Sequence, residues 1–307
     1  MKRMEKPGFD PGLTQQYTGN VRRVITRDGG LNVQRRGGTW RDYHLYLQLI
    51  NMRWPAFFAV IVSGYLVTNT LFAMVYWALG PNELSGDGRA YGHFLNCFFF
   101  SAHTLTTVGY GSISPIGLAS NIVAVTESMV GVLGFAVATG LLFGRISRPS
   151  AKIGFSDIMV MAPYQDGVSL QLRVANRRPN DLMEVQAQVM LMTVEDRAGH
   201  PMRRYHQLKL EREQVLFLAL TWTIVHPIDA DSPLAGLTAE DLARAQAEFV
   251  VMLKAYDDTF SQTVFARYSY RHDEVRWGKR FAPAFRVDPQ GDMIVELDRL
   301  GAVTDVG

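Results

Sequence analysis

Six consecutive residues from Thr106 to Gly111, with the sequence TTVGYG, have the types and spacing best suited to binding an ion. A potassium ion that sheds its water needs a stack of oxygen atoms in exchange, and backbone carbonyls can supply that stack. Successive carbonyls face the same side when the strand alternates between left-handed and right-handed backbone conformations, and glycine adopts both without steric cost. Gly109 and Gly111 occupy alternate places in the run. We therefore expect the carbonyl groups of this segment to line a cation path.

The run resembles the selectivity filter of potassium channels. That interpretation assigns K⁺ binding to Thr107, Val108, Gly109 and Tyr110, with the Thr107 hydroxyl below the carbonyl stack. The Val108 and Tyr110 side chains would point away from the axis and brace the filter. One chain supplies one wall only, so four copies around a closed axis are implied. The competing interpretation is a glycine-rich turn in an ordinary loop, and the flanking sequence must decide between the two.

Two apolar stretches flank the run, and each is long enough to cross a membrane. Residues 55–79 contain no charged residue, and residues 118–146 contain only Glu127 and, near the end, Arg145. About 20 apolar residues in a helix cross the hydrocarbon core. Residues 91–104 are apolar and aromatic but too short to cross, as expected of a re-entrant pore helix whose carbonyl end points at the filter. We predict two transmembrane helices separated by a pore helix and the filter.

Basic residues predict the orientation of the chain. Arginines are frequent before the first span and after the second, whereas Arg89 is the only basic residue between Gly80 and Gly117. The positive-inside rule places both termini in the cytoplasm and the filter mouth outside, in the cell (inner) membrane. The single cysteine, Cys97, cannot form an internal disulfide and suits a reducing compartment.

Composition excludes several other classes of protein. A net charge of +2 argues against a general nucleic-acid binder. The sequence contains no zinc pattern, P-loop or dinucleotide fingerprint, so we expect no cofactor apart from K⁺ as the conducted ion.

The chain before the first span divides into two predicted parts. Residues 1–39 are polar and glycine-rich and are expected to be irregular, although residues 21–25 could add an edge strand. Residues 40–52 place Trp40, Tyr43, Leu47 and Ile50 on one helical face. This second part is predicted to be a slide helix along the cytoplasmic interface, leading into a pore domain at residues 53–149.

From residue 150 to residue 307 the apolar period changes from that of a helix to that of a strand. Residues 182–195 alternate, with Val185, Ala187, Val189 and Leu191 on one side. A capping box at residues 238–241 predicts one short helix. Further strands are expected at 157–163, 168–176, 204–211, 216–225, 248–256, 260–272 and 293–298. We predict a β-sandwich with its own core, so the fold class is membrane α plus all-β.

These features together resemble the prokaryotic inwardly rectifying potassium channels. The resemblance rests on the Arg53-Trp54-Pro55 entry to the first span, TTVGYG, the Arg148-Pro149 exit from the second span, and the run WTIVHPID at residues 222–229. It implies a homotetramer with two spanning helices per subunit and an immunoglobulin-like cytoplasmic domain that extends the pore inward. The implied function is passive, K⁺-selective conduction, gated at the inner helix bundle and the cytoplasmic domain.

The resemblance also implies roles for two phenylalanines. Phe135 matches the cavity position where strongly rectifying relatives have an acid that holds polyamines, so strong rectification of that kind is not expected. Phe143, eight residues later, matches the bulky residue whose copies close the pore by dewetting. Packing or contact with lipid is the alternative for Phe143.

Four residues match family positions that contact anionic lipid headgroups, and they predict modulation by a phosphoinositide or another anionic phospholipid: Arg53, Trp54, Arg145 and Arg148. Each lies at a cytoplasmic helix end, where basic side chains meet a negative leaflet. Ordinary positive-inside anchoring explains the same charges.

A carboxylate inside the second span is a candidate for support of the filter. We expect Glu127 behind the filter, near His103 or the Thr104 hydroxyl, in preference to ion coordination. His103 stands where some relatives have a glutamate, so their salt bridge behind the filter does not transfer to this chain.

The second span is also rich in glycine. Gly131, Gly134 and Gly140 allow either bending or close helix packing, and Gly140 and Gly144 have the GxxxG spacing.

Two other functional classes fit the sequence less well. His226 and Asp229 could suggest a hydrolase or metal site, but no paired nucleophile accompanies them, and we expect a structural role and no enzyme activity. A membrane-tethered receptor with a vestigial filter is disfavoured by the intact TTVGYG. Voltage sensing is not expected because no span carries an arginine stripe.

Overall fold

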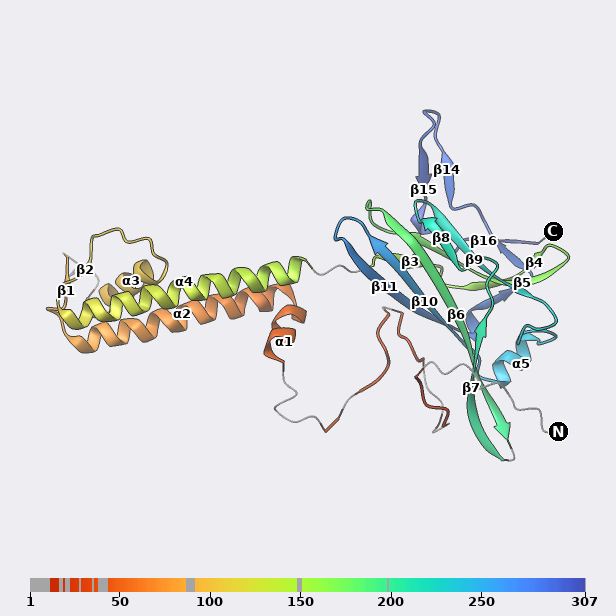
Figure 1. The fold of residues 1–307 in the computed structure, drawn as a ribbon, viewed down its shortest axis with the longest axis horizontal. Coiled ribbons are helices and arrows are strands. Elements are labelled where there is room, and N and C mark those ends of the chain that lie inside the picture. Colours follow the sequence, from red (N-terminus) through yellow and green to blue (C-terminus); the bar gives the residue numbers. More distant parts are fainter. Residues whose placement is uncertain are drawn as a thin grey trace. The chain divides into compact units, whose positions relative to one another are not determined.

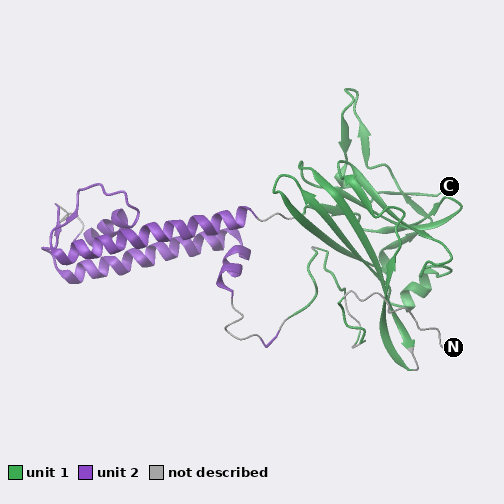
Figure 2. Cartoon of the chain, viewed as in Figure 1, with its two compact units in different colours: residues 1–35, 149–307 green, residues 36–148 purple. Residues whose placement is uncertain are grey.

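The computed structural model describes residues 12–16, 19, 23–27, 29–34, 36–37, 44–86, 92–147, 151–197 and 199–306. The chain forms two compact units (Figure 2). One unit comprises residues 36–148 and is helical. The other comprises residues 1–35 and 149–307 and is built from β-strands.

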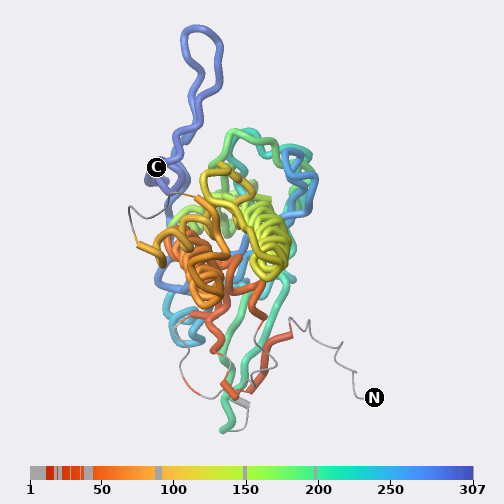
Figure 3. The backbone as a smooth tube through the Cα atoms, turned by 90° about the vertical axis from the view of Figure 1, so that its left-hand side faces the viewer, coloured from red at the N-terminus to blue at the C-terminus, as the bar shows by residue number. Residues whose placement is uncertain are grey.

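Two long helices run side by side in the helical unit, α2 (Trp54–Leu79) and α4 (Leu118–Ile146) (Figures 1 and 3). Both are long and apolar enough to cross a membrane. Between them in sequence lies α3 (His93–Leu105). Apolar side chains of all three helices form one cluster, which includes Ala73, Tyr76, Cys97 and Phe100. The bounds agree with the predicted spans and shift the pore helix by one or two residues.

Short elements complete the helical unit. Helix α1 (Leu45–Asn51) occupies the second half of the predicted slide helix and buries Ile50. Trp40 and Tyr43, from the predicted apolar face, lie outside the described residues. Strands β1 (Leu84–Ser85) and β2 (Ser114–Pro115) pair antiparallel, which joins the two ends of the pore loop.

Two five-stranded sheets form the β unit. The first has the order β11-β10-β6-β7, and β8 also pairs with β6. Its strands are β6 (Leu182–Arg197), β7 (His200–Leu208), β8 (Gln214–Phe217), β10 (Glu248–Asp257) and β11 (Gln262–Arg271). The second has the order β12-β4-β5-β3, and β9 also pairs with β5. Its strands are β3 (Ile153–Phe155), β4 (Met159–Tyr164), β5 (Gly167–Asn176), β9 (Thr221–Ile228) and β12 (Val275–Trp277).

Apolar side chains from both sheets share one core. Leu170 and Val174 of β5 belong to the same buried cluster as Val185 of β6 and Phe249 of β10. Helix α5 (Ala239–Arg244) contributes Leu242 and begins with the predicted capping box. The prediction of a β-rich domain with its own core is therefore confirmed.

Some predicted strand bounds were wrong. The predicted strand 216–225 is two strands, β8 and β9, which pair with different sheets. Part of the predicted strand 293–298 is a 3-10 helix, η4 (Leu297–Arg299), and a second such helix, η3 (His272–Glu274), lies before β12. The remaining short strands have too few residues for a periodic signal. They are β13 (Lys279–Phe281), β14 (Phe285–Val287) and β16 (Val303–Asp305). Strand β15 (Met293–Val295) is the first part of the predicted strand 293–298.

Strands β14 and β15 form a hairpin that projects from the rest of the β unit (Figures 1 and 3). At the other extreme of the sequence, part of the N-terminal segment packs on the first sheet. Val24 and Ile25 are buried against Met190, Met192 and Tyr205. The possible edge strand at residues 21–25 is reduced, within the described residues, to a bridge between Ile25 and Leu31.

Candidate ion-conduction site

The backbone of the TTVGYG segment alternates in the sign of φ. Thr107, Gly109 and Gly111 have φ values of 58°, 56° and 78°, whereas Val108 and Tyr110 do not have positive φ. This alternation turns successive carbonyls toward the same side. The two glycines were expected to adopt it. Thr107 was not, and its left-handed conformation extends the pattern by one residue.

The end of the pore helix holds this segment by backbone hydrogen bonds. The amides of Val108 and Gly109 donate to the carbonyl oxygen of His103, at 3.0 and 3.3 Å, and the amide of Thr107 donates to that of Thr104, at 3.0 Å. The His103 ring also meets the Tyr110 ring edge to face, with centroids 4.7 Å apart. The position of the TTVGYG segment therefore follows that of the last turn of α3.

Glu127 is fully buried, and its partners differ from those expected. The Tyr76 hydroxyl donates to Glu127 Oε2 at 2.7 Å, and the Ser101 hydroxyl donates to Oε1 at 2.5 Å. These partners replace His103 and Thr104 in the interpretation, because the carboxylate meets α3 one turn from its end. Sequence reasoning missed Tyr76 and Ser101. Polar groups inside apolar segments were the available signal.

The glycines of α4 fall into two groups. A Cβ on Gly131 would overlap the carbonyl oxygen of Leu105, and a Cβ on Gly144 would lie 3.1 Å from the Tyr46 hydroxyl. Gly134 and Gly140 have no atom within 4 Å of such a Cβ. Close packing therefore accounts for Gly131 and Gly144 within a single chain, and the other two positions are open.

Both phenylalanines assigned to the pore are exposed in the single chain, Phe135 by 76% and Phe143 by 70%. Neither contributes to the apolar clusters of its unit among the described residues. Their rings are thus available to a neighbouring chain, to lipid or to a pore.

Arg145 makes intramolecular contacts at the end of α4. Its Nη1 donates to the carbonyl oxygens of Leu49 and Ile50 at 2.7 and 2.8 Å, and its Nη2 donates to that of Met52 at 2.7 Å. The guanidinium also lies 4.5 Å from the centre of the Trp54 ring. Arg145 therefore ties the carbonyl end of α1 to α4. Arg53 is exposed, and Arg148 lies outside the described residues.

His226 is held as a structural residue of the β unit. Its Nδ1 lies 2.6 Å from the Lys209 carbonyl oxygen, so this nitrogen donates, and its Nε2 accepts from the Ser232 hydroxyl at 2.8 Å. Burial lowers the pKa of His226, which favours the neutral ring. Asp229 accepts the Asp231 amide in a local turn. These hydrogen bonds give both residues a structural role, as expected from the sequence.

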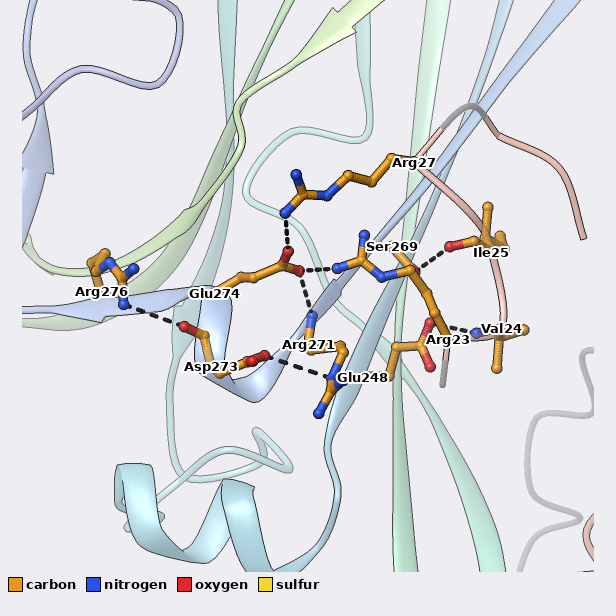
Figure 4. A network of polar contacts seen from close by, with 10 residues as sticks. All are labelled: Arg23, Val24, Ile25, Arg27, Glu248, Ser269, Arg271, Asp273, Glu274 and Arg276. Atoms are coloured by element: carbon orange, nitrogen blue, oxygen red, sulfur yellow. Dashed lines mark hydrogen bonds and ion pairs between the residues drawn. The ribbon is translucent and has the colours of Figure 1, made fainter. Parts of the chain in front are cut away.

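A polar network joins the N-terminal segment to the β unit (Figure 4). Arg23 and Arg27 converge on the carboxylate of Glu274, the latter at 2.9 Å. Burial would raise the pKa of Glu274, but the Arg271 amide and the two guanidinium groups outweigh burial and hold it below its ordinary value. The Val24 amide donates to Glu248, and the Ser269 hydroxyl donates to the Ile25 carbonyl, both at 2.8 Å.

Comparison with known families identifies the class of protein. Residues 57–148 match the model described as Ion channel, and residues 153–307 match the Inward rectifier potassium channel C-terminal domain. The chain is an ion-channel protein with two spanning helices and a β-rich domain, and it is not an enzyme. It belongs to the inward rectifier potassium channel family, as the motifs predicted.

Two relatives illustrate the similarity. The chain is 37% identical over 281 residues to the inward rectifier potassium channel Kirbac3.1 of Paramagnetospirillum magnetotacticum, covering 90% of this chain and 94% of that one. It is 29% identical over 308 residues to the ATP-sensitive inward rectifier potassium channel 14 of Homo sapiens, covering 90% and 69%. Among solved structures, the sporulation control protein Spo0M of Bacillus subtilis is 13% identical in sequence, with 42% of this chain and 50% of that chain covered and a TM-score of 0.24.

Proposed function

We propose that four copies of this chain assemble around a common axis and conduct K⁺ selectively through the carbonyl groups of residues 106–111. The observation that carries the proposal is the alternation of φ at Thr107, Gly109 and Gly111. A strand of this form presents oxygen ligands to one side, and four such strands around an axis can replace the water shell of K⁺. Assembly would also cover Val108 and Tyr110, which are exposed in the single chain.

The gate in this proposal is the ring of Phe143 side chains near the end of α4. Four exposed phenyl rings at one level of a pore form an apolar constriction, which closes by dewetting. Phe135 lies in the cavity between this gate and the filter. It offers no charge to a polyamine, so block by polyamines at this position is expected to be weak.

The proposal also takes anionic phospholipid as the modulator of the channel. Both termini would lie in the cytoplasm, by the positive-inside rule. Arg53 and Trp54 are exposed at the start of α2, where a headgroup would meet them. Arg145 has both terminal nitrogens engaged by carbonyl oxygens of α1 and its neighbours. We therefore propose that the headgroup binds Arg53 and Trp54. Arg148 is included on its position in the sequence alone, after the end of α4.

Flux measurements on purified protein in liposomes test the function. We expect K⁺ or Rb⁺ flux well above Na⁺ flux, and a change in that flux when an anionic phosphoinositide is added. Gly109→Ala should lose K⁺ flux because its φ of 56° strains any residue with a Cβ. Gly167→Ala, at the exposed first residue of β5 with open space around a Cβ, is the matched control and should keep it.

Equal K⁺ and Na⁺ fluxes would contradict selective conduction. Absence of flux in every lipid mixture would favour the receptor interpretation. An unchanged flux on addition of phosphoinositide and other anionic lipids would remove the lipid assignment and leave the conduction proposal intact.

A further inference from the structure

We infer that Tyr76, Ser101 and Glu127 form a polar clamp that positions the selectivity filter and sets its discrimination between K⁺ and Na⁺. The inference rests on the proposed conduction function and adds positioning residues to it. The clamp takes one residue from each helix of the pore: Tyr76 from α2, Ser101 from α3 and Glu127 from α4.

The two oxygens of Glu127 are divided between the other two helices. Oε2 accepts from the Tyr76 hydroxyl at 2.7 Å, and Oε1 accepts from the Ser101 hydroxyl at 2.5 Å. Ser101 Oγ also lies 3.2 Å from both the carbonyl and the side-chain oxygen of Asn69 on α2. A serine has one hydroxyl proton, and the shortest contact identifies Glu127 as its acceptor.

Because the three side chains are buried, the loss of one of these hydrogen bonds would be costly. Tyr76, Ser101 and Glu127 all have no exposed surface, so water cannot replace a lost partner. A buried acidic group without donors is costly, and hydrogen bonds to such a group are stronger than those between neutral groups. The three helices are therefore held in the one arrangement that satisfies both carboxylate oxygens.

The polar clamp adds directionality to apolar packing at the same place. Tyr76 also belongs to the apolar cluster with Ala73, Cys97 and Phe100, and its ring meets Phe100 edge to face at 4.9 Å. Apolar contacts fix the spacing of helices but tolerate small rotations and slips, whereas hydrogen bonds depend on angle. The clamp therefore fixes the rotation and height of α3 relative to α2 and α4.

A displacement of α3 would also displace the filter, because the two are joined by hydrogen bonds. Ser101 lies two residues before His103, whose carbonyl oxygen accepts the amides of Val108 and Gly109. Gly131, one turn beyond Glu127 on the same face of α4, lies against the carbonyl of Leu105, the last residue of α3. A rotation of α3 allowed by loss of the clamp would move the oxygen atoms that distinguish K⁺ from Na⁺.

Single-hydroxyl deletions test the clamp in the full-length protein. Tyr76→Phe and Ser101→Ala each remove one donor to Glu127 with little change in volume. We expect each to lower the K⁺-to-Na⁺ flux ratio in liposomes by about fivefold or more, the factor that one buried hydrogen bond corresponds to. Tyr65→Phe removes the same hydroxyl from a more exposed position of α2 and should keep the wild-type ratio. Size-exclusion elution and melting temperature, measured in parallel, separate a change in the filter from a failure to assemble.

The outcomes distinguish the clamp from the function on which it rests. A wild-type protein that fails to prefer K⁺ contradicts the proposed function. A selective wild type with Tyr76→Phe and Ser101→Ala variants that assemble and retain its ratio overturns the clamp. If Ser101→Ala does not assemble, Tyr76→Phe decides alone, because phenylalanine preserves the ring that packs on Phe100.

Discussion

At the scale of the residue, Thr107 departs most from ordinary backbone preference. A β-branched residue at a φ of 58° is strained, at a cost of about 1–3 kcal/mol. The hydrogen bond from its amide to the Thr104 carbonyl oxygen holds it in place, as do the hydrogen bonds from the next two amides to His103. Strain of this kind persists where the surroundings over-determine a conformation, and here it adds one more residue to the alternating segment.

The gate proposed at Phe143 is also a feature of single residues. Phe143→Ala should raise basal K⁺ flux severalfold, because in the proposed tetramer the replacement of four phenyl rings by methyl groups would widen and wet the constriction. Val125→Ala, at another exposed apolar position of α4, is the control and should leave basal flux near that of the wild type. Unchanged flux in Phe143→Ala liposomes would move the gate to another level of the pore.

At the scale of the element, α4 contacts different helices along its length. Its first half holds the pore helix through Glu127 and Gly131, and its end holds α1 through Arg145. The guanidinium of Arg145 takes three carbonyl oxygens at the exit of α1, which a helix terminus leaves without partners of its own. Movement of the C-terminal end of α4 is therefore coupled to α1.

The glycines of α4 give a prediction at the same scale. Gly131→Ala should destabilise the assembled protein by roughly 1–3 kcal/mol, because its Cβ meets backbone that cannot move aside cheaply. Gly134→Ala, in open space on the same helix, should be neutral or stabilising because alanine favours the helix. Melting temperatures of the two detergent-solubilised variants check this, and equal values would refute the packing role of Gly131.

At the scale of the whole molecule, the N-terminal segment packs on strands that lie far from it in the sequence. The outer side of β6 places Met190 and Met192 away from the shared core, and the N-terminal segment covers them with Val24 and Ile25. Arg23 forms an ion pair with Glu274, which lies 251 residues later in the sequence (Figure 4). The N-terminal segment is thus part of the fold of the β unit.

Acidification should release this N-terminal contact. The folded pKa of Glu274 is depressed, so its contribution to docking is fully present above the ordinary value of 4.5 and is lost as the pH falls through the lower, folded pKa. At neutral pH, Glu274→Gln should mimic the acid state and weaken docking by roughly 1.4 kcal/mol, or tenfold in the opening equilibrium. Hydrogen exchange of the amides of residues 23–27 measures the opening.

Asp273→Asn is the matched control for this experiment. Asp273 is adjacent, is more exposed and pairs with Arg271 at 3.6 Å, so its loss should change exchange little. Equal protection of residues 23–27 in the Glu274→Gln variant and the wild type would show that the apolar contacts of Val24 and Ile25 alone hold the segment.

Much of the fold follows from periodicity that a single sequence displays. Runs of more than 20 apolar residues and the alternation of residues 182–195 are local signals, and both predicted their elements. The short strands β12, β13, β14 and β16 carry no such signal, since three residues cannot display a period. The division of residues 214–228 into strands of two sheets depends on which neighbours are available, and no local pattern records that.

The two spans, the β-rich domain and the family could be predicted from the sequence alone, because length, hydropathy, strand alternation and short motifs are properties of consecutive residues. Tertiary structure alone decided the partners. It gave Glu127 to Tyr76 and Ser101, Arg145 to the carbonyls of α1, and Glu274 to Arg23 and Arg27. A carboxylate or guanidinium can bond to any complementary group within reach, and only the packed helices and strands determine which group that is.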